Sequence, residues 1–300
     1  MSTFTIVGLG EVLWDIFSTH KQLGGAPTNF AYISSLLGER AVVASRVGID
    51  DLGAAVVERL DSLHLSTSHL QRDHEHPTGT VQIELAADGQ PRFEFAQYVA
   101  WDFLAWDAAW EQLAQVADAV CFGSLAQRSL QSRATIQRFL RATSSSALRV
   151  FDINLRQAFY SAEVLSESAE RADIVKLNHE EVLPLMTLLG EPVDGDIDAA
   201  RWLCEQFELK LVCVTRGGNG SLLYTPDGQH EHPGFRVKVA DTVGAGDAFT
   251  ATMVHHFLRG SSLPTMNDAA NLMGSWVASM PGATPTADPE IVDRARAVSA

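Results

Sequence analysis

The sequence contains few cysteines and few basic residues. Its 300 residues include only three cysteines, Cys121, Cys204 and Cys213, which form no C-x-x-C pair. An odd number of widely spaced cysteines argues against a disulfide framework and against a zinc site, so we expect buried free thiols. Lys and Arg number 22 against 37 Asp and Glu, which gives a net charge of −15, and the basic residues do not cluster. Because binding to a phosphate backbone needs a basic stripe, we expect no nucleic-acid partner.

Long apolar runs and a basic N-terminal leader are also absent. No run reaches the ~18 apolar residues of a membrane-spanning helix, and the opening stretch MSTFTIVGLGEVLWD carries no Lys or Arg. We therefore expect no membrane association and a cytoplasmic location. The chain also lacks repeats, low-complexity tracts and a long linker. Its length allows one α/β domain or two, and without a linker we expect a single domain over residues 1–300.

Short β-branched runs alternate with helix-like segments along most of the chain. The runs are FTIVGLG (4–10), RAVVASRVG (40–48), DAVCFG (118–123), LRVFDIN (148–154), DIVKLN (173–178) and LVCVTRG (211–217). Parallel strands need crossovers of this kind, so the alternation predicts an α/β fold with a mostly parallel sheet and helices on both faces. Ligands of such sheets bind beyond the carboxyl ends of the strands.

Residues 79–98, GTVQIELAADGQPRFEFAQY, interrupt this alternation. The apolar positions are Val81, Ile83, Leu85, Phe93 and Phe95. They alternate with polar residues on either side of an Asp88-Gly89 turn, which predicts a β-hairpin with one apolar face. We expect that face to be buried over the main domain as a lid, or against the same element of a second subunit.

Two glycines and an aspartate precede a helical run near the C-terminal end, in the stretch VADTVGAGDAFTATMVHHFLRG (239–260). Apolar residues recur at helical spacing from Phe249, so Gly244–Asp247 is predicted to lie at a helix N-terminus. Such a terminus presents unpaired N–H groups and the positive end of the helix dipole, and glycines let an anion approach closely. The segment therefore predicts an anion cradle.

Asp247 needs a role of its own in this cradle, because a carboxylate there repels an anionic ligand. Accepting the proton of an attacking hydroxyl during phosphoryl transfer is one such role. Capping the helix is another, and it is common for Asp at this place. The residues of the segment alone leave both roles open.

Longer motifs carry a resemblance to a known family. DTVGAGDAF (241–249) resembles the C-terminal signature of the ribokinase-like (PfkB) carbohydrate kinases, and QLGGAPTNFAYISSLLG (22–38) with SRVGIDDLG (45–53) resembles their N-terminal signature. GEVLWD, FDINLR, NHEE, TRGGNG and PGATP extend the resemblance over essentially the whole chain. It implies an ATP-dependent sugar kinase built as a ribokinase-like three-layer sandwich, with a mostly parallel central sheet and a small β-sheet lid. The lid is expected to be discontinuous, from roughly residues 11–25 and 76–101.

The resemblance also implies which residues catalyse transfer and hold the sugar. Asp247 is the expected general base, and the amides of Gly244, Ala245 and Gly246 are expected to stabilise the transferring phosphoryl group. The residues expected to contact the sugar are Asp15, Gly25, Asn29, Trp101, Asn154 and Arg156. Taken without the resemblance, Asp15 also fits a turn cap, Trp101 fits core packing and Arg156 fits a loop salt bridge.

Nucleotide and cation residues are implied in the same way. The residues expected to bind ATP and its Mg²⁺ are Asn178, Glu181, Thr215, Gly217, Gly220 and Asn271. Asn178 and Glu181 would act on magnesium and phosphate through water, although an Asn followed by acidic residues is more commonly a capped helix start. The glycine pattern at 215–220 is not a Walker loop, because G-x-x-x-x-G-K-[ST] occurs nowhere in the chain. Positions that match a family site for potassium (K⁺), built largely from main-chain carbonyls, are Asp241, Val243, Gly282 and Thr286.

Fructose, phosphorylated at O6, is the expected substrate. GEVLWD, QLGGAPTN, SRVG, AWD and D-x-N-x-R together look most like bacterial fructokinases. The alternatives are 2-keto-3-deoxygluconate, which would give Arg156 a carboxylate to bind, and a nucleoside. A sugar-sensing protein without catalysis is the alternative from a different class, and the retained Asp247 argues against it. The apolar face of the hairpin predicts a homodimer formed through the lid.

Overall fold

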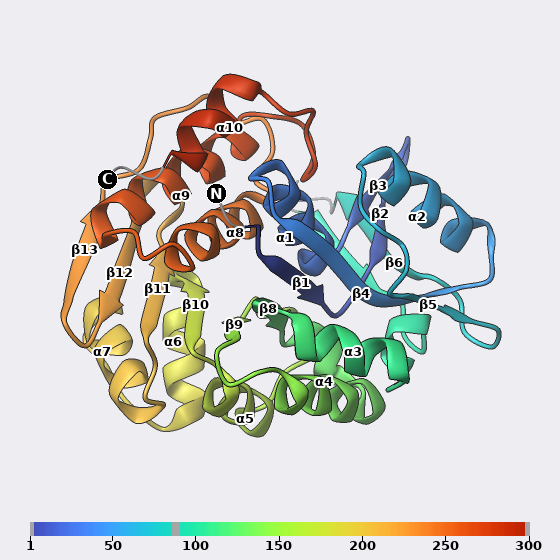
Figure 1. Ribbon diagram of the computed structural model, residues 1–300, viewed down its shortest axis with the longest axis horizontal. Helices are drawn as coiled ribbons and strands as arrows, with labels where there is room; N and C mark the ends of the chain where they lie inside the picture. The colour runs from blue at the N-terminus through green and yellow to red at the C-terminus, as the bar shows by residue number, and fades with distance from the viewer. Residues whose placement is uncertain (1–2, 86–90, 298–300) are drawn as a thin grey trace.

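A mostly parallel sheet forms the centre of the molecule in the computed structural model, which describes residues 3–85 and 91–297 (Figure 1). Its strands are β1 (Thr5–Leu9), β4 (Arg40–Gly48), β5 (Leu70–Asp73), β8 (Ala119–Gly123), β9 (Leu148–Asp152), β10 (Ile174–Asn178), β11 (Leu211–Thr215), β12 (Ser221–Thr225) and β13 (Gly228–His232). Their order is β13-β12-β11-β10-β9-β8-β1-β4-β5, and only the β11–β12 and β12–β13 pairs are antiparallel in this sheet. The six predicted runs form β1, β4 and β8 to β11, which confirms the predicted fold class.

Helices cover both faces of this sheet. They are α1 (Ala26–Leu36), α2 (Asp51–Ser62), α3 (Ala108–Val116), α4 (Leu130–Ala142), α5 (Ala162–Arg171), α6 (His179–Leu189), α7 (Asp196–Gln206), α8 (Ala245–Phe257), α9 (Leu263–Ala278) and α10 (Pro289–Arg296). Helices α1, α2 and α8 to α10 enclose one core, and α3 to α7 enclose the other (Figure 1). In β1, Ile6 belongs to the first core and Val7 to the second. Because both faces are buried, the central strands, such as β1 and β8 to β11, are mostly apolar runs, whereas the edge strand β13 is polar.

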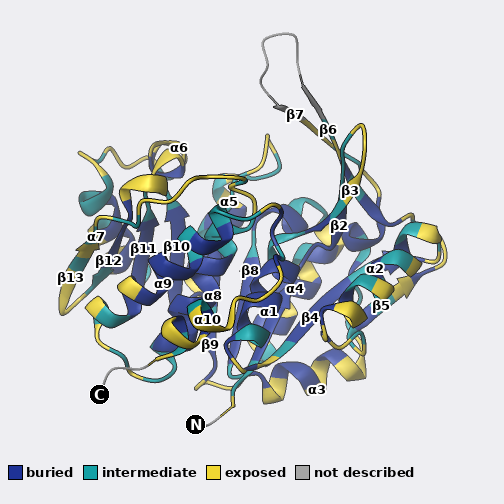
Figure 2. Ribbon diagram, turned by 90° about the horizontal axis from the view of Figure 1, so that it is seen from above, coloured by how far each residue is buried: buried dark blue, intermediate teal, exposed yellow. Residues whose placement is uncertain are grey.

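A second, four-stranded sheet rises from one end of the main sheet (Figure 2). It contains β2 (Leu13–Ile16), β3 (Lys21–Gly24), β6 (Gly79–Leu85) and β7 (Pro91–Phe95), in the order β3-β2-β6-β7. We call it the small sheet. Strands β6 and β7 form the predicted hairpin, while the Asp88-Gly89 turn lies outside the described residues. All four strands fall within the ranges expected for the lid.

The apolar face of the hairpin is buried only near its base. Val81, which pairs with Phe95, is 1% exposed. Phe95 packs edge-on against Phe159 of the main domain, with ring centroids 5.9 Å apart. Phe93, which pairs with Ile83 further out, is 46% exposed. The main domain therefore covers the base of this face and leaves its outer part open.

The small sheet is attached to the main sheet through Asp50, a residue of the SRVGIDDLG motif. Asp50 caps helix α2 by accepting a hydrogen bond from the N–H of Gly53 (2.7 Å). The same carboxylate accepts from the N–H and the hydroxyl of Thr78, at 2.8 and 2.7 Å. Thr78 immediately precedes β6, so one side chain joins the start of α2 to the base of the hairpin.

The expectations about cysteine are confirmed: Cys121, Cys204 and Cys213 are buried and free. In residues 3–85 and 91–297 no helix is both long and apolar enough to cross a membrane.

Candidate active site

The two signature motifs meet where helices α1 and α8 begin. Asn29 lies in the first turn of α1 and Asp247 in the first turn of α8. The side-chain amide of Asn29 donates a hydrogen bond to Asp247 Oδ2 at 2.8 Å, although the residues are 218 positions apart in the sequence. Both helices start beside the carboxyl ends of the central strands, which is the edge where α/β sheets bind ligands.

Asp247 does not cap its helix. The N-cap residue of α8 is Gly244, and no described side chain provides a capping hydrogen bond there. Burial and, to a smaller extent, the negative charge of Asp152 raise the pKa of the Asp247 carboxyl, which is about 6 in this site. The hydrogen bond from Asn29 and the positive charges of Lys176 and Arg156 act in the opposite direction. With this pKa, the carboxyl group is ionised at neutral pH. The pKa is also close enough to neutral pH for the carboxylate to accept a proton.

The first turn of α8 is shaped by Gly244, which has a φ of +78°. The N–H groups of the residues that follow, including Gly246, have no partner within the helix because no residue lies four positions before them inside it. These groups and the positive end of the helix dipole give this turn the features expected of the predicted anion cradle.

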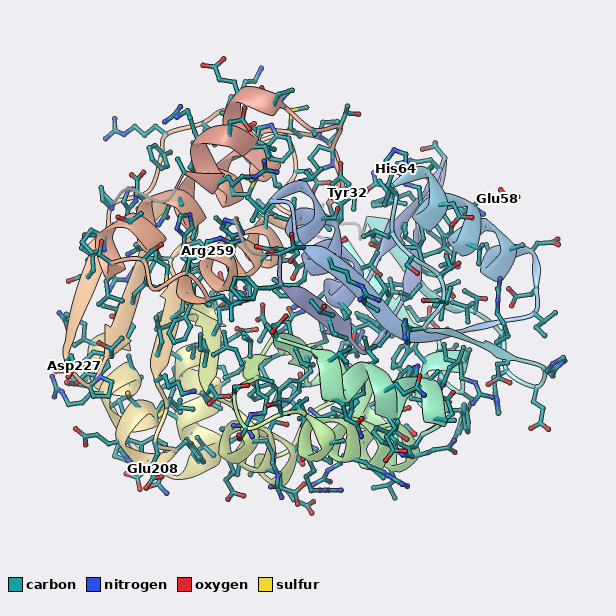
Figure 3. The ribbon with its side chains drawn as sticks, in the orientation of Figure 1. Tyr32, Glu58, His64, Glu208, Asp227 and Arg259 are labelled. Carbon is teal, nitrogen blue, oxygen red and sulfur yellow. The ribbon has the colours of Figure 1, made fainter. Side chains whose placement is uncertain are left out.

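The loop that contains Ala283, Thr284 and Pro285 packs behind this turn and is held by two side chains of the main domain. Tyr32 of α1, labelled in Figure 3, donates its hydroxyl to the carbonyl of Pro285 at 2.6 Å. Arg59 of α2 donates to the Thr284 hydroxyl at 3.1 Å. A Cβ atom added to Gly244 would lie 2.5 Å from the Cβ of Ala283, so the loop packs directly against the start of α8.

Residues expected to hold the sugar come from the small sheet, from the start of α1 and from the loop after β9. Asp15 of β2 has a pKa raised by burial to about 6 and lowered in part by the charge of Arg156. Gly25 has a φ of +103°, and a Cβ there would lie 2.5 Å from the carbonyl oxygen of Glu11, so no larger residue fits. Asn154, with a φ of +45°, turns the chain after β9 and leads into Arg156.

Arg156 is exposed in the loop after β9. Among the described residues it forms one hydrogen bond, to the carbonyl of Leu155 at 3.0 Å. Its positive charge lowers the pKa values of Asp15, Glu11 and Asp247, so it faces all three carboxyls. The structure therefore places Arg156 by the site and does not pair it in a loop salt bridge.

Glu11 is a buried carboxyl that interacts with the charge of Asp247 and that the sequence prediction did not include. It is 3% exposed, and burial, together with the charge of Asp247, raises its pKa to about 7. Its Oε2 has no hydrogen-bond partner among the described residues. The available signal was an acidic residue directly after the first buried strand, in GEVLWD.

Trp101 is placed in the core. Its side chain is 1% exposed, and the guanidinium of Arg128 lies 4.0 Å from the centre of its ring. This placement favours the core-packing alternative for Trp101.

Asn178 and Glu181 form the capping box that the alternative interpretation describes. Asn178 Oδ1 accepts from the N–H groups of Glu180 (2.9 Å) and Glu181 (3.0 Å), and Glu181 Oε2 accepts from the N–H of Asn178 (2.8 Å). Glu181 Oε1 also accepts from the N–H of Leu155 at 2.7 Å. The buried Glu181 therefore holds the chain that follows Asn154.

The remaining nucleotide residues lie around the end of β11. Thr215 ends this strand, and Gly217 and Gly220 follow it with φ values of +56° and +81°. Asn271 of α9 is buried and donates to the hydroxyl of Ser221 at 2.8 Å. It therefore anchors α9 to the start of β12 behind the glycine turn.

The predicted cation residues come from two loops that Asp241 joins. Its carboxylate accepts from the N–H of Val243 at 3.0 Å and from the N–H of Gly282 at 3.2 Å. Thr286, which follows Gly282 in the second of these loops, is exposed. No group of three or more His, Cys, Asp or Glu side chains within the described ranges is arranged to hold a metal ion.

Comparison with known proteins places this geometry in a family. The model of the pfkB family carbohydrate kinases matches residues 6–290. An uncharacterised sugar kinase of Pyrococcus horikoshii is 31% identical, with 90% of this chain and 88% of that protein covered. Its structure in complex with ATP has a TM-score of 0.83, with 29% identity and coverage of 98% of this chain and 99% of that one.

Fructokinases are also similar to this chain. The fructokinase of Escherichia coli is 28% identical, with 77% of this chain and 75% of that protein covered. A double mutant of the Vibrio cholerae O395 fructokinase, in fructose, ADP and potassium ion bound form, has a TM-score of 0.79 and 25% identity. That comparison covers 95% of this chain and 96% of the other.

Proposed function

The chain belongs to the pfkB family of carbohydrate kinases, and we propose that this sugar kinase transfers the γ-phosphoryl group of ATP to O6 of fructose. The observation that carries the proposal is the position of Asp247 in the first turn of α8, where its carboxylate accepts a hydrogen bond from Asn29. Similarity to the fructokinases, at 25% and 28% identity, supports fructose as the acceptor. The ATP-bound relative supports ATP as the donor. The three free thiols agree with a cytoplasmic location.

The mechanism follows from the two helix starts. The N–H groups at the start of α8 bind the oxygens of the transferring phosphoryl group and stabilise the charge that develops on them. Asp247, ionised above pH 6, aligns the attacking hydroxyl and accepts its proton. Asp15, Asn29 and Arg156 orient the sugar from the small sheet, from α1 and from the loop after β9.

Magnesium enters this reaction as part of the MgATP substrate, where it neutralises phosphate charge. Each carboxylate oxygen of Glu181 already accepts a main-chain N–H, at 2.7 and 2.8 Å. Glu181 and Asn178 therefore fit contact with the hydrated ion through water and do not fit direct coordination.

A potassium site between the two loops joined by Asp241 is part of the proposal. Both carboxylate oxygens of Asp241 accept main-chain N–H groups, so Asp241 would shape the site while main-chain carbonyls, oxygen donors of the kind that hard cations prefer, would hold the ion. The loops contain Val243 and Gly282 and meet directly behind Gly244. A cation there would stabilise the start of α8.

The test of the proposed function is ADP release from MgATP with a panel of acceptors, with and without potassium. The panel contains fructose, ribose, glucose, tagatose, 2-keto-3-deoxygluconate and adenosine. We expect the highest kcat/KM with fructose and faster turnover with potassium. A higher value with another acceptor would replace fructose, and no turnover with sugar binding retained would favour the sugar-sensing alternative.

Arg156 supports 2-keto-3-deoxygluconate as the second candidate acceptor, because its guanidinium is exposed in the loop after β9 and matches a carboxylate. If the substrate is acidic, Arg156→Gln is expected to raise KM for it by ~10- to 100-fold, since a hydrogen bond to a charged group contributes ~1.5–3 kcal/mol. KM for fructose is expected to change much less. Arg201→Gln, on the surface of α7, is the matched control. If Arg156→Gln changes KM equally for fructose and for 2-keto-3-deoxygluconate, Arg156 does not recognise a substrate carboxylate.

We propose a homodimer formed through the small sheet. Phe93 is 46% exposed on the outer part of the hairpin, where the main domain does not cover it. A dimeric mass is expected by sedimentation velocity at micromolar concentration, and Phe93→Asp is expected to shift it toward the monomer. Leu183→Asp, at a 72% exposed position on α6, should leave the mass unchanged. A monomer at all micromolar concentrations would contradict the proposal.

A further inference from the structure

A buried ion pair lies beneath the first turn of α8 and has no part in the mechanism described so far. Lys176 of β10 and Asp152 of β9 are neighbours in the parallel register of these strands. Lys176 Nζ lies 3.1 Å from each carboxylate oxygen of Asp152. Their side chains are 7% and 5% exposed. A buried ion pair is often no more stable than apolar residues of the same size, so its position suggests a role other than packing.

Thr250 attaches this pair to the catalytic turn. Its hydroxyl contacts Asp152 Oδ2 at 3.1 Å and the carbonyl of Gly246 at 2.9 Å. A Cβ added to Gly246 would lie 3.0 Å from Lys176 Nζ. The ammonium group is therefore directly behind the backbone that forms the anion cradle, and the absence of a side chain at Gly246 keeps that space open.

A small cavity separates the pair from the candidate base. Its volume is about 10 Å³, which is the size of one water molecule, and its polar lining comes from Asp152, Asp247 and Thr250. Because Asp152 and Asp247 line the same small buried cavity, charges there interact more strongly than they do in water. The pair can therefore act on Asp247 without touching it.

Charged groups face Asp247 from several elements and act in opposite directions. Asp152 of β9 raises the pKa of Asp247, and Lys176 of β10 lowers it. Arg156, in the loop after β9, also lowers it, while Glu11, after β1, is a second carboxyl at close range. Burial lowers the pKa of the Lys176 ammonium group, but the charges of Asp152 and, to a smaller extent, of Glu181 on α6 raise it by more, so the group stays charged at neutral pH. The Cys121 thiol of β8 borders the cavity, and burial raises its pKa so that it stays neutral.

We propose that Lys176 is a positioning residue for phosphoryl transfer, whose ammonium group is held by Asp152 behind Gly246 and provides a fixed positive charge for both the anion cradle and Asp247. The inference rests on the proposed function. Lys176 donates its hydrogen bonds to Asp152, stays outside the binding surface, and acts through the helix start on the groups that touch the substrates.

The test compares Lys176→Met and Asp152→Asn in the full-length protein, using the pH dependence of kcat/KM for the preferred sugar. Lys176→Met is expected to lower kcat by ~100-fold and to move the acidic limb up by about one pH unit, because Asp247 loses a stabilising cation. Asp152→Asn is expected to move the same limb down, because a neighbouring anion is removed. Lys210→Met, which disrupts the partly exposed pair with Asp173, should leave the limb in place.

Two further measurements keep the outcome decisive. The double variant Lys176→Met/Asp152→Asn removes both charges and is expected to fold even if a single variant does not, with kcat still reduced by ~100-fold. Titration of the Asp247 carboxyl carbon by ¹³C NMR, assigned against Asp247→Asn, reads the same shifts without turnover. The proposal is wrong if the acidic limbs of Lys176→Met and Asp152→Asn move in the same direction or do not move. It is also wrong if the double variant has the wild-type kcat. Wild-type turnover on the acceptor panel tests the proposed function separately.

Discussion

Asp247→Asn is expected to lower kcat for sugar phosphorylation by ~10³-fold or more while sugar affinity changes only a few-fold. General-base catalysis contributes ~10²- to 10⁴-fold to a rate, and Asn has nearly the same shape as Asp but cannot accept the hydroxyl proton. The contact with Asn29, 2.8 Å from Asp247 Oδ2, can be kept by the oxygen of the new amide. The measurements are ADP release at saturating substrates and sugar binding by calorimetry.

Two comparisons make this result specific. Asp198→Asn, at an exposed position in the first turn of α7, removes a carboxylate from another helix start and should leave kcat unchanged. Glu11 is a second buried carboxyl beside Asp247, with a pKa raised to about 7. A loss in Glu11→Gln that exceeds the loss in Asp247→Asn, or substantial residual turnover in Asp247→Asn, would assign the proton transfer to another group.

Gly244→Ala is expected to lower kcat by ~100-fold and to destabilise the fold. The residue has a φ of +78°, and the added Cβ would lie 2.5 Å from the Cβ and 2.8 Å from the Cα of Ala283. Since Tyr32 and Arg59 anchor the neighbouring loop, the start of α8 must move instead. A displacement of about 1 Å at reacting groups can cost ~10²-fold in rate. The measurements are kcat and the midpoint of thermal unfolding.

Gly260→Ala is the matched control for that variant. Gly260 has a φ of +68°, so it carries a similar backbone penalty of roughly 1–2 kcal/mol, but no atom lies within 4 Å of its added Cβ. It is expected to lower the unfolding midpoint while kcat stays at the wild-type value. If both variants lose turnover equally, the contact with the loop at Ala283 is not what positions the helix start.

The local features of this protein were predictable because they repeat at short range. Strand runs such as RAVVASRVG are recognised as short β-branched stretches, and the helix that follows Gly244 is recognised from a spacing of three to four residues; both were found where the pattern predicts them. The hairpin in residues 79–98 was predicted from the alternation of apolar and polar residues. Its burial was left open, and it depends on contact with Phe159, which is distant in the sequence.

Several site residues had two interpretations that the sequence could not separate. Asn178 and Glu181 fit both a capped helix and a phosphate site, and the structure shows the capping bonds. Asp247 also fitted a cap, and the structure shows Gly244 in that place. Whether a polar side chain is already satisfied depends on its neighbours in space, so a linear pattern carries no information about it.

The sequence prediction missed Lys176 and Glu11 because the role of each depends on an interaction with a residue that is distant in the sequence. Lys176 stands in the buried strand run DIVKLN, where a charged residue is unusual and is the one available signal. Its partner, Asp152, becomes visible only once the strand order places β9 beside β10. Glu11 likewise gains its raised pKa from burial and from the charge of Asp247, which is far away in the sequence.

Short-range patterns in the sequence were enough to identify the family, the α/β class, the hairpin and the helix start at Gly244, because glycine patterns, helix starts and apolar spacing are properties of short segments. The tertiary structure alone decided that Asn29 contacts Asp247, that Trp101 is in the core and that Lys176 lies behind Gly246. These facts depend on strand order, on register and on which side chains become buried together. Those properties arise only when distant segments pack against one another. They set how strongly the charged groups in the site interact.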